Sequence, residues 1–104
     1  MATAKITAGI CNFTTTVQAE SSDQETARIT ICTNCPNLKP LEGQTLEVDG
    51  MTECFGKIGE GEIYEWCRPY CRHAACPVPT GIVKATEVAC GLALPKTAVL
   101  ELEK

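Results

Sequence analysis

The stretch FTTTVQAESSDQETARITIC, residues 13–32, decides the fold because it holds two alternating runs joined by a turn. Apolar and polar side chains alternate through residues 13–20, and residues 27–32 repeat that pattern around Ile29 and Ile31. Alternation with a period of two is typical of a strand that buries one face. The intervening Ser21-Ser22-Asp23 has the composition of a turn. The stretch therefore predicts two antiparallel strands.

The segment before this stretch extends the pattern by one strand. Residues 5–10 alternate as well, with Ile6 and Ile10 on one face, so three runs with short links predict a three-stranded antiparallel meander. If the first run continues without a break, the Cys11 side chain lies on the face opposite its apolar residues. The Cys32 side chain likewise lies on the face opposite the apolar residues of the third run. Both cysteines fall at strand ends, where loops begin and binding sites are often built.

The segments after the meander predict helices and one further strand. Apolar residues recur at helical spacing through residues 63–71, interrupted at Pro69, and again through residues 80–90. Residues 97–103 alternate with a period of two, which predicts a C-terminal strand joining the sheet. The whole chain, residues 1–104, is thus expected to form one α+β domain with two or three short helices packed on one face of the sheet.

Composition and charge exclude several classes of function. The apolar fraction of 44% argues against disorder, and the nine basic residues of this chain of net charge −4 form no run of the kind that nucleic-acid binding needs. No apolar stretch is long enough to span a membrane. The first ten residues do not resemble a signal peptide, so we expect a cytoplasmic protein. No phosphate-binding loop, dinucleotide fingerprint or catalytic triad indicates an enzyme class.

The eight cysteines are the unusual feature of this composition. In the reducing cytoplasm we expect free thiols, which bind metals, carry out redox or sulfur chemistry, or pack in the core. They are Cys11, Cys32, Cys35, Cys54, Cys67, Cys71, Cys76 and Cys90. Because Cys11, Cys35 and Cys76 each fall where a predicted element meets a loop, they are the primary candidates for a site.

An iron–sulfur cluster is the first hypothesis for that site. Cys35 precedes a proline, as cluster ligands often do, and forms a Cys-x-x-Cys pair with Cys32. Cys11, Cys35 and Cys76 are the predicted primary ligands of a [4Fe–4S] cluster, with Cys32 and Cys71 as further candidates. A zinc site is the runner-up. Zinc sites usually contain a second Cys-x-x-Cys pair, and this sequence has none. The role would be electron transfer, or delivery of the cluster or metal to a redox partner or acceptor enzyme.

Two other hypotheses remain open. The motif Cys76-Pro77-Val78-Pro79 resembles the Cys-Pro-x-Pro signature of the TusA/SirA-like sulfur carriers, and this resemblance implies a catalytic Cys76 that carries a persulfide. At the start of a helix, free backbone N–H groups are expected to stabilise a thiolate there. In the third hypothesis the chain is a non-catalytic interaction module, whose thiols only pack in the core.

Three longer stretches carry a further resemblance. They are ITAGICNF at residues 6–13, CPNL at residues 35–38 and HAACPVPTGI at residues 73–82, the last running on to GLALP at residues 91–95. Together they are similar to a small family of unknown function from anaerobic bacteria and methanogenic archaea. The resemblance implies an anaerobic cytoplasm, and with it reduced thiols and oxygen-sensitive cofactors. It implies no reaction.

Overall fold

The computed structural model describes residues 1–104 and contains four strands, three α-helices and one short 3-10 helix. In chain order these elements are β1 (Ala2–Thr7), β2 (Thr14–Glu20), β3 (Thr26–Thr33), the 3-10 helix η1 (Lys39–Leu41), β4 (Leu46–Asp49), α1 (Gly50–Cys54), α2 (Glu62–Cys67) and α3 (Val78–Ala89). None of the helices is long and apolar enough to cross a membrane.

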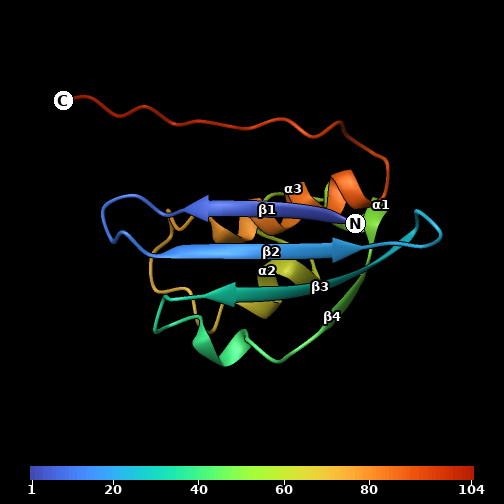
Figure 1. The fold of residues 1–104 in the computed structure, drawn as a ribbon, viewed down its shortest axis with the longest axis horizontal. Helices are drawn as coiled ribbons and strands as arrows, with labels where there is room; N and C mark the ends of the chain where they lie inside the picture. Colours follow the sequence, from blue (N-terminus) through green and yellow to red (C-terminus); the bar gives the residue numbers. More distant parts are fainter.

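The four strands form one antiparallel sheet in the order β1-β2-β3-β4 (Figure 1). The register places Val17 of β2 between Ala4 of β1 and Ile31 of β3, and Ala19 lies opposite Ile29. In β3 buried and exposed residues alternate along the whole strand. The alternation of residues 13–32 therefore describes a sheet that buries only one of its faces.

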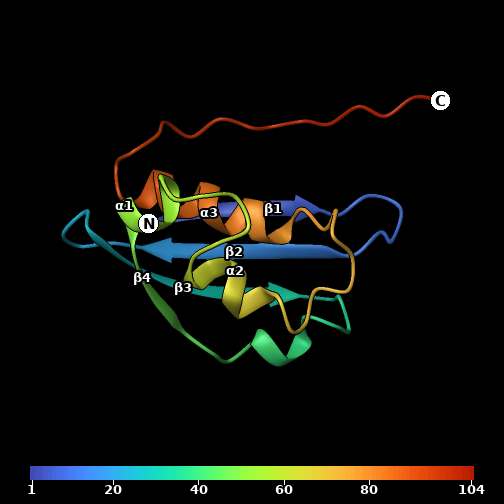
Figure 2. The same ribbon diagram turned by 180° about the vertical axis from the view of Figure 1, so that it is seen from behind.

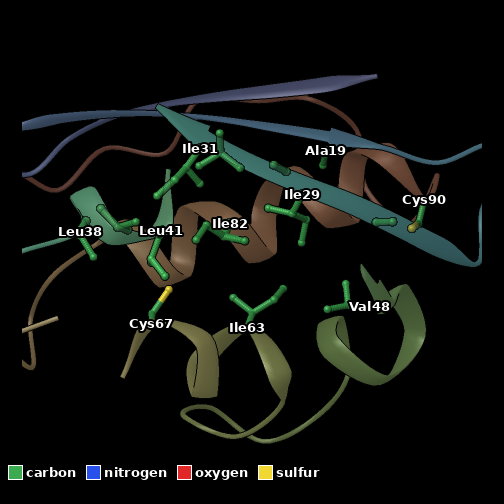
Figure 3. Close-up of a cluster of buried hydrophobic side chains, with 14 residues drawn as sticks. Ala19, Ile29, Ile31, Leu38, Leu41, Val48, Ile63, Cys67, Ile82 and Cys90 are labelled. Carbon is green, nitrogen blue, oxygen red and sulfur yellow. The ribbon is translucent and has the colours of Figure 1, made fainter. Parts of the chain in front are cut away.

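The helices cover that buried face, so the molecule has two layers (Figures 1 and 2). The long helix α3 packs across β1 and β2, and the shorter α1 and α2 pack beside it and against β4. Ile29, Ile63 and Ile82 are fully buried between the layers (Figure 3). Full burial of such a side chain stabilises the fold by about 1.5–3 kcal/mol. The core is therefore aliphatic, as the low aromatic content requires.

The predicted three-stranded meander with a C-terminal fourth strand is wrong in one part. The fourth strand is β4, which pairs with residues 26–29 of β3, and residues 97–103 belong to no strand and are exposed. In Figure 1 this red segment leaves the end of α3 and runs outside the sheet. The α+β class is confirmed.

The physical reason for this error is that alternation shows only that a segment suits a strand. It does not show whether a strand edge is available to pair with it. β4 contributes four residues, of which only Val48 is buried, so its pattern is too short to recognise. Its position follows from η1 and the turn at Gly43, which bring the chain back along β3.

Candidate functional site

Four cysteines from different parts of the chain meet beside α2 and the start of α3, and we call them the thiol cluster: Cys35, Cys67, Cys71 and Cys76. The Cys71 thiol lies 4.0 Å from the Cys76 sulfur, measured between the two Sγ atoms. A hydrogen bond also joins the thiols of Cys71 and Cys67. Cys35 is near enough to Cys76 to affect its pKa through charge, without a direct sulfur contact. Except for the fully buried Cys67, these side chains are half-buried.

Local backbone structure brings the last three of these cysteines together. α2 ends at Cys67, and the N–H of Cys71 then donates to the Cys67 carbonyl at 2.8 Å, which adds one turn after the helix. This turn places Cys71 above Cys67, because residues four apart lie on the same side of a helical turn. The N–H of Cys76 donates to the His73 carbonyl at 3.1 Å, so a tight turn returns Cys76 to Cys71.

A carboxylate from α1 fixes the start of α2. The buried Glu53 accepts hydrogen bonds from the N–H groups of Glu62 and Ile63, at 3.0 and 2.8 Å. These groups have no partner within the helix, and a negative charge is favourable at a helix N-terminus. Gly61 leaves the space for the carboxylate, because a Cβ there would lie 3.0 Å from both of its oxygens. Glu53 therefore holds the helix that carries Cys67.

Replacing Glu53 with alanine is expected to lower the free energy of unfolding by about 1–2 kcal/mol, the usual cost of a lost helix cap. Chemical denaturation of the reduced, metal-free protein measures this change. Glu47→Ala is the matched control, since Glu47 is an exposed partner in a surface ion pair with Arg28 and should cost at most about 0.5 kcal/mol. Equal stability of the two variants would show that the Glu53 carboxylate does not support α2.

Two thiols of the cluster, those of Cys71 and Cys76, have raised pKa values that favour their protonated form. Hydrogen bonding to Cys67, together with burial, raises the pKa of Cys71 far above its ordinary value. Burial also raises the pKa of Cys76 to about 11, although contact with the backbone N–H of Val78 lowers it. The stabilising effect expected from the start of α3 is thus present, but burial and the neighbouring thiols outweigh it. Crowded neutral thiols lose their protons readily only when a cation is supplied.

A surface hollow of about 550 Å³ opens beside the cluster. Cys67, Cys71 and Cys76 form part of its wall, and Arg68, Arg72 and His73 lie around the same space. The remaining lining residues are neutral: Ile58, Gly59, Tyr64, Ala74, Pro79 and Thr80. No Asp or Glu lines it, so the hollow combines thiols with positive charge in a protein of net charge −4.

The other predicted site residues lie apart from these contacts. Cys11 is exposed in the turn between β1 and β2, at the same end of the sheet as the segment that leads into α3 (Figures 1 and 2). Cys32 is exposed on the open face of the sheet, opposite the buried Ile31, as strand parity predicts. It lies near Glu42, whose pKa is lowered mainly by the N–H of Thr33. Although Cys32 and Cys35 are three residues apart, the Cys32 thiol lies on the open face of the sheet, whereas Cys35 packs against the core on the other face.

Two more cysteines lie toward the far end of α3. Cys90 is buried, and its sulfur fills the space that a Cβ on Gly50 would need. The half-buried Cys54 lies near it, and burial raises the pKa of Cys54 to about 11. These two thiols belong to the packing around α1 and α3 and not to the hollow.

Several residues of the site carried no recognisable signal in the sequence. Cys67 was not among the predicted ligands; it is buried in the core and also contacts Cys71. Nothing near Glu53 in the sequence indicates that it caps a helix beginning nine residues later. As the side chains stand, no group of three or more Cys, His, Asp or Glu is arranged to hold a metal ion.

Comparison with known proteins gives one match. Residues 2–102 match the model of a family described as a family of unknown function (DUF6951). No curated protein and no solved structure matches the chain.

Proposed function

We propose that this chain, which belongs to the DUF6951 family of unknown function, is a metal-binding protein that holds its metal through the thiol cluster. The observation that carries this proposal is the approach of Cys71 and Cys76 to 4.0 Å, with Cys67 and Cys35 as their next sulfur neighbours. Four thiolates are a common ligand set for zinc and for iron.

The sulfur separation favours a mononuclear tetrahedral centre. With metal–sulfur bonds of about 2.3 Å, tetrahedral geometry separates two sulfur ligands by about 3.8 Å. The 4.0 Å between Cys71 and Cys76 is close to that value. Because no three ligand side chains converge as they stand, four-thiolate binding requires both Cys35 and Cys67 to turn their thiols toward this pair. Zinc or a single iron ion fits this arrangement best.

An iron–sulfur cluster is the second candidate, and the hollow favours it. Thiolate-ligated clusters carry net negative charge, and Arg68 and Arg72 lie beside the thiols without taking part in either ion pair of the protein. The hollow also leaves room next to the sulfurs for more than one metal atom. A cluster would give the protein a role in electron transfer, or in delivery of the cluster to an acceptor enzyme.

A sulfur-carrier role for Cys76 has less support. Its position before α3 and its access to the hollow suit a nucleophile. A nucleophilic cysteine must be ionised near neutral pH, however, and the Cys76 thiol has a pKa of about 11. Removal of the proton by a bound metal is the simpler way to use such a thiol.

The test is the metal and sulfide content of protein purified without oxygen. One zinc or iron per chain without sulfide supports the mononuclear centre, and iron with an equal amount of sulfide supports the cluster. Cobalt(II) added to metal-free protein should give the intense visible absorption of tetrahedral cobalt–thiolate if the mononuclear centre is correct. Protein that takes up no zinc, iron or cobalt would rule out both candidates.

Metal affinity is also expected to rise with pH. The ordinary thiol pKa of 9.0 is raised to about 11 at Cys76, so protons compete with the metal throughout the neutral range. For each proton that the metal displaces, the affinity for the metal should rise about tenfold per pH unit between pH 6 and 8. Zinc competition titrations against a chelator at several pH values measure this slope. A slope of zero would mean that the protein binds zinc without displacing protons, and so not through these thiols.

A further inference from the structure

The hollow beside the thiol cluster is shaped and charged for a second kind of ligand. Its volume of about 550 Å³ falls within the range of about 300–1,000 Å³ that is usual for small-molecule sites. Two arginines and one histidine line it, together with Tyr64 and Thr80, and no acidic residue does. Because the protein as a whole is acidic, this concentration of positive charge is local to the hollow.

The two arginines are differently engaged. The guanidinium of Arg68 donates to the backbone carbonyl of Gly59, which ties the loop before α2 to the wall of the hollow. Arg72 is exposed and has no hydrogen bond or ion pair within the protein. The two ion pairs in the structure are Arg28 with Glu47 and Lys39 with Glu42, both away from the hollow. Arg72 is therefore free to bind an anion, and Arg68 is already oriented.

The start of α3 adds to this positive environment. Pro79 and Thr80, in the first turn of the twelve-residue helix, form part of the wall. The N–H of Val78 contacts Cys76, and Pro79 has no N–H. The N–H of Gly81 already has a backbone acceptor, so the N–H of Thr80 is the one left without a partner. A free N–H at the start of a helix favours negative charge. Arginine binds carboxylate and phosphate oxygens through two parallel hydrogen bonds, so these are the groups that the hollow suits.

We propose that the hollow is a binding site for a small oxyanion-bearing molecule, with Arg72 and Arg68 holding its carboxylate or phosphate group beside the thiol cluster. The thiols lie in the same wall, so the rest of the bound molecule would reach the metal centre or the free sulfurs. Anion binding does not require the metal, and this proposal stands or fails separately from the metal-binding proposal.

The test is a titration of reduced, metal-free, isotopically labelled protein with inorganic phosphate and, separately, with succinate, followed by amide resonances at constant ionic strength. Saturable shifts in residues 72–80 and around Gly59 are expected for one or both anions. Arg72→Gln should weaken that binding about tenfold, which is the loss of one charge-assisted pair of hydrogen bonds. Saturation by phosphate alone or by succinate alone identifies which oxyanion the hollow prefers.

Arg28→Gln is the matched control, because it removes the same charge from the exposed open face of the sheet. It should bind each anion as the unaltered protein does. Shifts that grow without saturation, or that spread evenly over surface amides, would overturn the proposal. Equal weakening by Arg28→Gln and Arg72→Gln would overturn it as well, since the effect would then depend on net charge alone.

Discussion

Replacing Cys71 and Cys76 together with serine is expected to reduce the bound metal from about one equivalent per chain to almost none. The two sulfurs lie 4.0 Å apart, and both thiols line the hollow. A serine hydroxyl is a poor ligand for zinc or iron at neutral pH because it keeps its proton. Loss of a residue that only orients a ligand already costs about 10–100-fold in metal affinity, so losing two direct ligands should cost more than about 100-fold.

The matched control is the double variant Cys11→Ser and Cys32→Ser, in which two exposed thiols outside the cluster are replaced. It should keep its metal, which is measured by elemental analysis of both variants after purification without oxygen. Circular dichroism and thermal unfolding establish that both variants are folded. Metal retained without Cys71 and Cys76, but lost without Cys11 and Cys32, would place the centre at the exposed end of the sheet.

Replacing Gly81 with valine is expected to lower the free energy of unfolding by about 3 kcal/mol, at the upper end of the usual cost of overpacking a core. Gly81 is buried in α3 where the helix crosses β1. A Cβ at this position would lie 2.2 Å from Cδ1 and 2.6 Å from Cγ1 of Ile6. The helix and the strand would have to separate, because the side chain of Ile6 is itself packed against the core.

The companion variant tests this explanation directly. Ile6→Ala removes both of the atoms that the new side chain would meet, so Gly81→Val should cost much less when Ile6 is already alanine. Urea denaturation of the two single variants and the double variant gives the coupling. Lys84→Ala, on the exposed side of the same helix, should change stability by at most about 0.5 kcal/mol. Independent, additive costs for Gly81→Val and Ile6→Ala would show that these two residues do not limit the distance between α3 and β1.

Two strands of the sheet and the long helix could be predicted from the sequence because their signals are local, whereas the strand expected at residues 5–10 lies at Ala2–Thr7. Alternation in residues 13–20 and 27–32 corresponds to β2 and β3, and the predicted helix over residues 80–90 corresponds to most of α3. Each of these patterns is several residues long and reflects one buried face. Pro69 was also informative, since α2 ends at Cys67 and the chain continues as a turn.

The site was less predictable because it depends on contacts between distant residues. The sequence drew attention to Cys35, Cys71 and Cys76, and the structure brings Cys71 and Cys76 into contact with Cys35 nearby. Cys11 and Cys32 carried similar local signals, but both remain exposed. Loop position and Cys-x-x-Cys spacing show where a cysteine lies along the chain. They do not show which thiols come together after the helices pack.

The sequence by itself determined the α+β class of this protein, the buried face of its central strands, the position of its long helix and the abundance of cysteines. Only the tertiary structure decided that β4 and not residues 97–103 completes the sheet, since strand pairing requires an available edge. It also decided which four thiols share one environment and that Arg68 and Arg72 border it. These outcomes depend on the packing of α2 and α3 over the sheet, which joins residues that no local pattern connects.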